Sequence, residues 1–141
     1  MEEIILTSTL TILGGVIIYV IGQLVSKFLI DPIQEQKKIV SNISHTLFYY
    51  AHVFANTGVL KMEVNDEVWH KIRDLSSQLK SNYIIIPFYS IFSLSRCVIK
   101  RVNIDKAYPK MVALGNSVYS NGRGEKNQEI ISEIKKYLSI I

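Results

Sequence analysis

The chain has 141 residues, a net charge of +4, 48% apolar residues and one cysteine. This length leaves room for one soluble domain with one hydrophobic core, and the chain contains no repeats or low-complexity tracts. The lone cysteine excludes an intramolecular disulfide and fits a reducing compartment.

An uncharged run of 23 residues, from Ile4 to Ser26, lies near the start of the chain. As a helix it would be about 35 Å long, which is enough to cross a hydrocarbon core of about 30 Å. No second run follows, so the sequence predicts a transmembrane span over residues 1–30 and a helical domain over residues 31–141. A cleaved signal peptide and a buried soluble helix stay open as alternatives. The acidic start argues against the first, and the lack of a polar face against the second.

The charges on either side of this run predict its orientation. Glu2 and Glu3 precede it, whereas Lys27, Lys37 and Lys38 follow it. The positive-inside rule therefore places the N-terminus outside a bacterial inner membrane and the domain in the cytoplasm. Beyond residue 30, 15 basic residues stand against 10 acidic ones. This excess fits ordinary membrane topology, and it also fits a domain that binds a polyanion.

One face of the predicted span carries small and polar residues. Steps of three, four and seven bring together Ser8, Thr11, Gly15, Tyr19, Gly22, Gln23 and Ser26. Such residues mark contacts between membrane helices, and an amide in lipid costs free energy unless it finds a partner or water. The pattern predicts a homo-oligomer packed along this face, with an ion-conducting pore as a further hypothesis. An inert anchor is the alternative.

The next segment has helical periodicity and begins with Asp31 as a cap and Pro32 in the first turn. This helix is expected to run to about Thr57 and to stop at Gly58. Its buried stripe is predicted to comprise Ile33, Val40, Ile43, Leu47, Tyr50 and Phe54, with Ile39, Phe48 and Val53 as a second buried edge.

Three further helices are predicted, from Asn65 towards Pro87, over residues 103–119 and over residues 125–140. Their expected inward positions are Val68, Ile72, Leu75, Leu79, Ile104, Met111, Leu114, Val118, Ile130, Ile134 and Leu138. A short aromatic turn or helix follows Pro87, and a strand over residues 84–86 is disfavoured because no partner strand is evident. The predicted fold is all-α, one N-terminal transmembrane helix followed by a compact cytoplasmic helical bundle.

The sequence offers no set of residues for catalysis. His45 and His52 lie two turns apart, about 10 Å, which is too far for one metal ion. Neither a phosphate-binding glycine loop nor a nucleophile elbow occurs, and every arginine follows the last histidine, His70. We therefore expect no enzymatic activity, no metal and no cofactor.

The segment from Leu75 to Ile104 lacks acidic residues and interleaves basic with aromatic side chains. Such a pattern can hold single-stranded nucleic acid or a nucleotide by phosphate pairing and base stacking. The candidate ligand contacts are Lys80, Tyr83, Tyr89, Arg96, Lys100 and Arg101. The alternative is that the aromatic residues are core and the basic residues lie in solvent or at the lipid surface.

Several segments also resemble a group of small bacterial antiphage effectors with one N-terminal span and a helical domain. They are the uncharged run, residues 31–36 (DPIQEQ), 45–51 (HTLFYYA), 73–75 (RDL), 86–90 (IPFYS) and 114–118 (LGNSV). The chain is most similar to the channel effector of Hailong defence systems. That resemblance implies a nucleotidyltransferase partner whose oligodeoxyadenylate product controls the channel. A more distant similarity is to the membrane-pore accessory protein of type VI-B CRISPR systems, whose Arg-His motif is absent here.

These observations lead to two functional hypotheses. The first is an oligomeric, non-enzymatic membrane effector in antiphage defence, with a pore gated through its helical domain by an oligonucleotide signal. The second is a membrane-anchored helical scaffold or nucleic-acid-binding adaptor without conduction. A tethered nuclease is disfavoured because the sequence lacks an acid–base pair.

Overall fold

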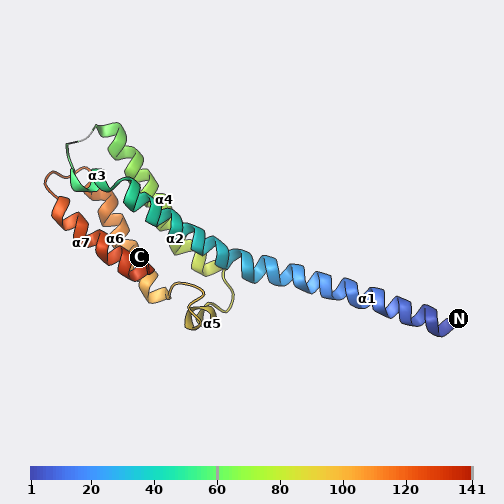
Figure 1. Ribbon diagram of the computed structural model, residues 1–141. Coiled ribbons are helices and arrows are strands. Elements are labelled where there is room, and N and C mark those ends of the chain that lie inside the picture. The colour runs from blue at the N-terminus through green and yellow to red at the C-terminus, as the bar shows by residue number, and fades with distance from the viewer. Residues whose placement is uncertain (60, 141) are drawn as a thin grey trace.

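The computed structural model of the chain describes residues 1–59 and 61–140, and within these ranges it contains helices and no strand. Helix α1 (Glu2–Val25) projects alone from a helical bundle (Figure 1). The bundle contains α2 (Asp31–Tyr49), α3 (Ala51–Ala55), α4 (Met62–Ile85), α5 (Tyr89–Leu94), α6 (Arg101–Ser117) and α7 (Gly124–Leu138). The prediction of an all-helical chain with one long apolar N-terminal helix is confirmed. Ile141, the last residue of the predicted domain, lies outside the described residues.

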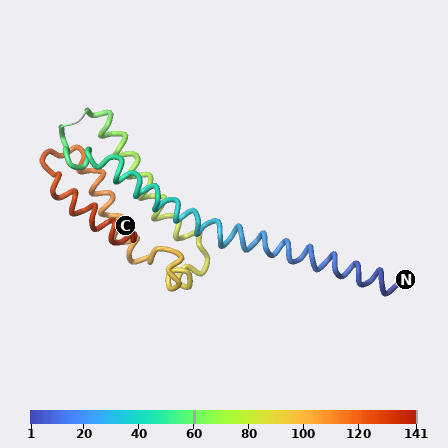
Figure 2. Tube along the Cα trace, in the orientation of Figure 1, coloured from blue at the N-terminus to red at the C-terminus, as the bar shows by residue number. Residues whose placement is uncertain are grey.

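Helix α1 continues into α2 through the π-helical turn η1 (Ser26–Ile30), and Figure 2 shows the three as one rod. Helix α2 begins at Asp31 as predicted, but the predicted cap is wrong because the helix continues from η1 without a break. Asp31 is itself helical, its side chain caps nothing, and its N–H donates to the Ser26 carbonyl five residues earlier. The cause lies in Pro32, which has no N–H to donate and whose ring crowds the carbonyl of the preceding turn. A wider π-turn accommodates that ring without ending the helix.

The predicted helix to Thr57 breaks at Tyr50, and the chain re-enters a helix at α3. The break lets Val53 and Phe54 of α3 become fully buried. The Nδ2 group of Asn127 in α7 donates to the Phe54 carbonyl over 3.0 Å and holds the new direction. Phe48, predicted to be buried, is 58% exposed. The Lys135 ammonium lies 3.9 Å from the centroid of its ring, which is a cation–π contact.

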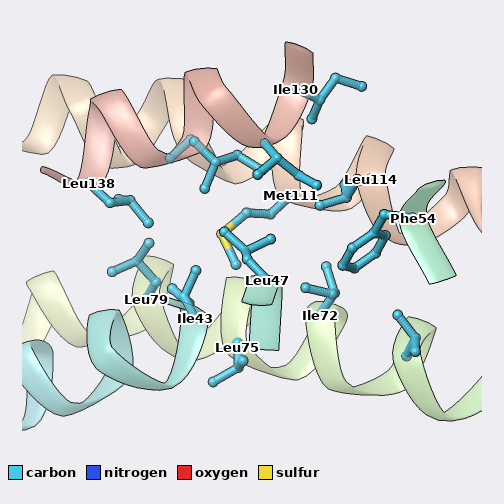
Figure 3. Close-up of a cluster of buried hydrophobic side chains, with 14 of the residues drawn as sticks. Ile43, Leu47, Phe54, Ile72, Leu75, Leu79, Met111, Leu114, Ile130 and Leu138 are labelled. Atoms are coloured by element: carbon cyan, nitrogen blue, oxygen red, sulfur yellow. The ribbon is translucent and has the colours of Figure 1, made fainter. Parts of the chain in front are cut away.

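The core lies between a layer formed by α2 and α4 and a layer formed by α6 and α7, as Figure 3 shows. Helix α4 begins three residues before the predicted start at Asn65, and it ends before Pro87 as predicted. The short helix α5 after Pro87 also agrees with prediction. All the inward positions predicted for α4, α6, the residue after α6 and α7 are buried, namely Val68, Ile72, Leu75, Leu79, Ile104, Met111, Leu114, Val118, Ile130, Ile134 and Leu138. Apolar periodicity therefore located the part of the core that α4, α6 and α7 supply, whereas Ile33, Val40 and Tyr50 of the predicted first stripe are only half-buried.

Candidate functional site

Helix α1 has no buried residue and packs against no other part of the described chain. It forms the apolar part of a continuous helix over Glu2–Tyr49 that is long and apolar enough to cross a membrane. Its large apolar side chains, such as Ile4, Ile12 and Ile18, are exposed. A large apolar surface left uncovered in this way is typical of a helix that is covered by something outside its own chain.

The predicted contact face of α1 is likewise open. A methyl group added at Gly15 or Gly22 would meet no atom within 4 Å, so nothing in the single chain occupies that face. The hydroxyls of Ser8 and Thr11 each donate over 2.8 Å to a carbonyl one turn earlier in their own helix. The Gln23 side chain has no hydrogen-bond partner in the part of the chain that the structure describes, so its amide is the strongest demand for an external partner.

The remaining members of that face lie along the same helix. Tyr19 is exposed in α1. Ser26 lies in η1, where its carbonyl accepts the hydrogen bond from the N–H of Asp31. The face thus reaches from α1 into the π-turn that leads to the bundle.

A buried polar cluster around Gln36 joins the first turns of α2 to the rest of the bundle. The Gln36 side chain is 1% exposed. Its Nε2 group donates to the Tyr89 hydroxyl over 3.0 Å and to the Asn82 Oδ1 atom over 3.4 Å. Its Oε1 atom accepts from the backbone N–H of Ile99 over 2.8 Å. One side chain in the helix that is continuous with α1 is therefore bonded to α4, to α5 and to the segment before α6.

Sequence reasoning missed Gln36, although a signal was present. Residues 33, 36, 40, 43 and 47 follow one another at steps of three and four, so Gln36 is a polar residue in the middle of an apolar stripe. A buried amide at such a position has to be hydrogen-bonded, because leaving it unpaired costs free energy. Its partners Asn82 and Ile99 are distant in sequence, and no local pattern points to them.

Tyr89, predicted to stack on a ligand, is instead part of this cluster. Its hydroxyl accepts from Gln36 and donates to the Ile99 carbonyl. Burial raises the pKa of Tyr89, while the hydrogen bond from Gln36 opposes that shift. The ring packs edge-on against Tyr83 with 5.9 Å between centroids. Tyr89 therefore holds α5 in place, and its role as a ligand contact stays a prediction.

Lys80, Tyr83 and Arg101 come together around Asp105, the first acidic residue after the acid-free segment. The Lys80 ammonium forms an ion pair with Asp105, and this hydrogen bond raises the pKa of Lys80. The Arg101 Nε atom lies 4.0 Å from the same carboxylate. The Arg101 guanidinium also lies 5.0 Å from the centroid of the Tyr83 ring, and the Lys80 ammonium lies 5.6 Å from it. Asp105 therefore neutralises part of the charge of Lys80 and Arg101, and both cations lie close to the ring of Tyr83.

Arg96 and Lys100 form a separate group beside a cavity of about 510 Å³. Both are exposed, and neither forms an ion pair with another described residue. The cavity is also lined by Ile99 and by Asn103 in the first turn of α6, where the positive end of the helix dipole favours an anion. The N–H of Asn103 itself donates to the Lys100 carbonyl over 2.8 Å. A second cavity of about 210 Å³ is lined by Gln36, Arg96 and Ile99. Of the six predicted ligand contacts, Arg96 and Lys100 are the most available to a phosphate.

Comparisons of the chain with family profiles, curated proteins and solved structures find no match. The described residues contain no group of three or more His, Cys, Asp or Glu side chains placed to hold a metal ion. The features that indicate a function are the uncovered helix α1, the Gln36 cluster and the cavity beside Arg96 and Lys100.

Proposed function

We propose that this chain is an oligomeric membrane effector whose spans form an ion-conducting pore gated by the helical bundle. Helix α1 would cross the bacterial inner membrane with its N-terminus outside and the bundle in the cytoplasm. The observation that carries the proposal is the lack of any buried residue in α1, an apolar helix with an unpartnered Gln23 and an uncovered face at Gly15 and Gly22. Packing of several copies along that face would satisfy the amide and line a polar path.

The continuous helix supplies a mechanical connection between signal and pore. Because η1 joins α1 to α2 without a loop, a shift of α2 in the bundle moves the span as well. The cavity lined by Arg96 and Lys100 includes Ile99, whose N–H is bonded to Gln36 of α2. An anion bound in that cavity would act one hydrogen bond away from the span-bearing helix. It would gate the pore if it bound one arrangement of α2 more tightly than the other.

The resemblance to the Hailong channel effector identifies the signal to test first, an oligodeoxyadenylate made by a nucleotidyltransferase. The experiment reconstitutes the full chain in dye-loaded liposomes and measures ion flux with and without a short oligodeoxyadenylate. We expect flux that the oligonucleotide changes. The paired variant Gly15→Leu/Gly22→Leu is expected to abolish flux, because it fills the proposed contact face.

Gly14→Leu is the matched control, because Gly14 lies on a different face of α1 and a side chain there also meets nothing within 4 Å. It should conduct like the natural chain. Vesicles that stay tight under every ligand condition would contradict the proposal.

A membrane-anchored scaffold is the second candidate, and one observation favours it. The hydroxyls of Thr7, Ser8, Thr9 and Thr11 are all bonded within α1, so they need no partner helix in lipid. Among the described residues of that face, the polar side chains left without a hydrogen bond are then Tyr19, Gln23 and Ser26. Under this candidate the Gly15→Leu/Gly22→Leu variant would keep its function and the liposomes would not conduct.

A further inference from the structure

The corner between α4 and α5 exposes five large apolar side chains within eleven residues. They are Ile84, Ile85, Phe88, Ile91 and Leu94, called the α4–α5 corner below, with exposed fractions from 65% for Ile91 to 85% for Leu94. Residues 81–95 contain no charged side chain. A soluble surface scatters its exposed apolar residues, so this concentration indicates a surface that is covered in the working protein.

The corner lies at the end of the bundle from which α1 emerges (Figure 1). The hydrogen bond from Gln36, in the second turn of α2, to Tyr89 of α5 fixes this placement. With α1 in lipid, as proposed above, the corner would face the same membrane surface that α1 leaves. The apolar corner and the span together would then form one continuous lipid-facing surface.

The charges around the corner match a bilayer with anionic headgroups. Lys27 and Lys37 lie on the helix that leaves the span, and Arg96 follows α5 directly. The acidic groups of that end are Asp31, Glu35 and Asp105, of which Glu35 lies 3.6 Å from Lys38 and Asp105 pairs with Lys80. Apolar residues flanked by free basic groups are the composition of an interfacial membrane element, which anionic lipid attracts.

The length of the apolar helix gives the bundle freedom to reach the surface. From Ile4 to Ile30 the helix has 27 residues with Lys27 as its one charge. At ~1.5 Å per residue that is about 40 Å, against a hydrocarbon core of about 30 Å. A tilt of about 40° would fit the helix into that core, with Lys27 reaching back to the headgroups. A tilt toward α5 lowers the corner onto the membrane.

We propose that the α4–α5 corner docks into the lipid interface as a second membrane contact beside the span. This inference rests on α1 crossing the membrane, and it adds a surface whose seating fixes the tilt of α1. Docked and lifted states of the corner would differ in that tilt, so lipid composition would act on the span through α5.

Nitroxide spin labels in liposomes that contain anionic lipid test the proposal on the full chain. In a Cys97→Ser background, Ile85→Cys and Leu94→Cys report on the corner. Ile17→Cys reports on the middle of α1, and Val59→Cys reports on the exposed turn after α3, at the end of the bundle away from α1. Collision rates are measured with oxygen, which concentrates in lipid, and with a water-soluble nickel chelate. We expect oxygen to prevail at positions 85, 94 and 17, and the nickel reagent at 59.

Three other outcomes of the spin-label experiment can be told apart. Positions 85 and 94 open to nickel while 17 is in lipid would overturn the docking and leave the span intact. Spin–spin broadening at 85 and 94, with both reagents excluded, would show a second copy of the chain covering the corner and would overturn the docking as well. Nickel access at position 17 would refute the membrane span itself.

Discussion

Replacing Gln36 by Leu tests whether the polar cluster holds α2, the helix continuous with α1, to the rest of the bundle. The change removes three hydrogen bonds, to Tyr89, Asn82 and Ile99. Each is worth roughly 1 kcal/mol net, and a buried partner left unpaired costs about 1–3 kcal/mol. The side chain of Leu is similar in size and recovers part of this loss by apolar burial. We therefore expect Gln36→Leu to lower the free energy of unfolding by about 2–4 kcal/mol.

The assay is urea unfolding of the full chain in a mild detergent, followed by the fluorescence of the single tryptophan. Trp69 is a suitable reporter, because its Nε1 group donates to Asn116 of α6 over 3.0 Å and this contact is lost on unfolding. Gln34→Leu is the matched control, since Gln34 lies in the same helix and is exposed, and it should change stability by about 0.5 kcal/mol or less. Equal effects of the two substitutions would refute the role assigned to the cluster.

Three further predictions concern other contacts. Hydrogen bonding to Glu67 raises the pKa of Tyr50 to about 12 from its ordinary value near 10, so the stabilisation is present below pH 10 and is lost from pH 10 to 12. The urea midpoint should fall over that window by more in the natural chain than in Tyr50→Phe. Gly124→Ala should destabilise by about 1–3 kcal/mol, because its Cβ would lie 2.4 Å from the Ala55 carbonyl oxygen, and the thermal midpoint should drop. Asp105→Asn should free two cations and steepen the salt dependence of oligodeoxyadenylate binding by about 0.7 in log–log slope per cation.

A different result would refute each of these three predictions. Parallel pH curves for the natural chain and Tyr50→Phe would remove the Glu67 contact from the account. Gly115→Ala is the control for Gly124→Ala, since its Cβ would meet Ile72 at an ordinary 3.4 Å, and an equal loss at both glycines would refute the steric argument. An unchanged salt slope in Asp105→Asn would mean that the paired bases take no part in polyanion binding.

The sequence was a good guide wherever the deciding interaction is local. Residues at helical spacing identified the buried faces of α4, α6 and α7, because burial of an apolar stripe is what makes these helices stable. Pro87 correctly ended α4 for the same kind of reason, since it restricts the residue before it. The expectation for Phe48 failed because it was grouped with Ile39, which is nine residues away and so about half a turn away around the same helix. The break at Tyr50 was missed because the Asn127 bond that holds α3 comes from more than 70 residues away.

The candidate site was less predictable because its contacts are long-range. Nothing near Lys80 in the sequence indicates that Asp105 neutralises it, and nothing near Tyr89 indicates that Gln36 and Ile99 engage its hydroxyl. The six predicted ligand contacts consequently divide into a paired group around Asp105, a structural tyrosine and the free pair Arg96 and Lys100. A local cap at Asp31 was also inferred wrongly, since the π-turn before Pro32 is a compensation that spacing does not reveal.

The most direct test of the central claim is the mass of the full chain extracted from membranes into lipid nanodiscs and measured by native mass spectrometry. One chain weighs 16.1 kDa. The account predicts a protein mass that is a fixed multiple of this value, reduced towards one chain by Gly15→Leu/Gly22→Leu and unaffected by Gly14→Leu. A natural chain that stays at a single copy in lipid, or that remains dispersed in buffer without detergent, would contradict it.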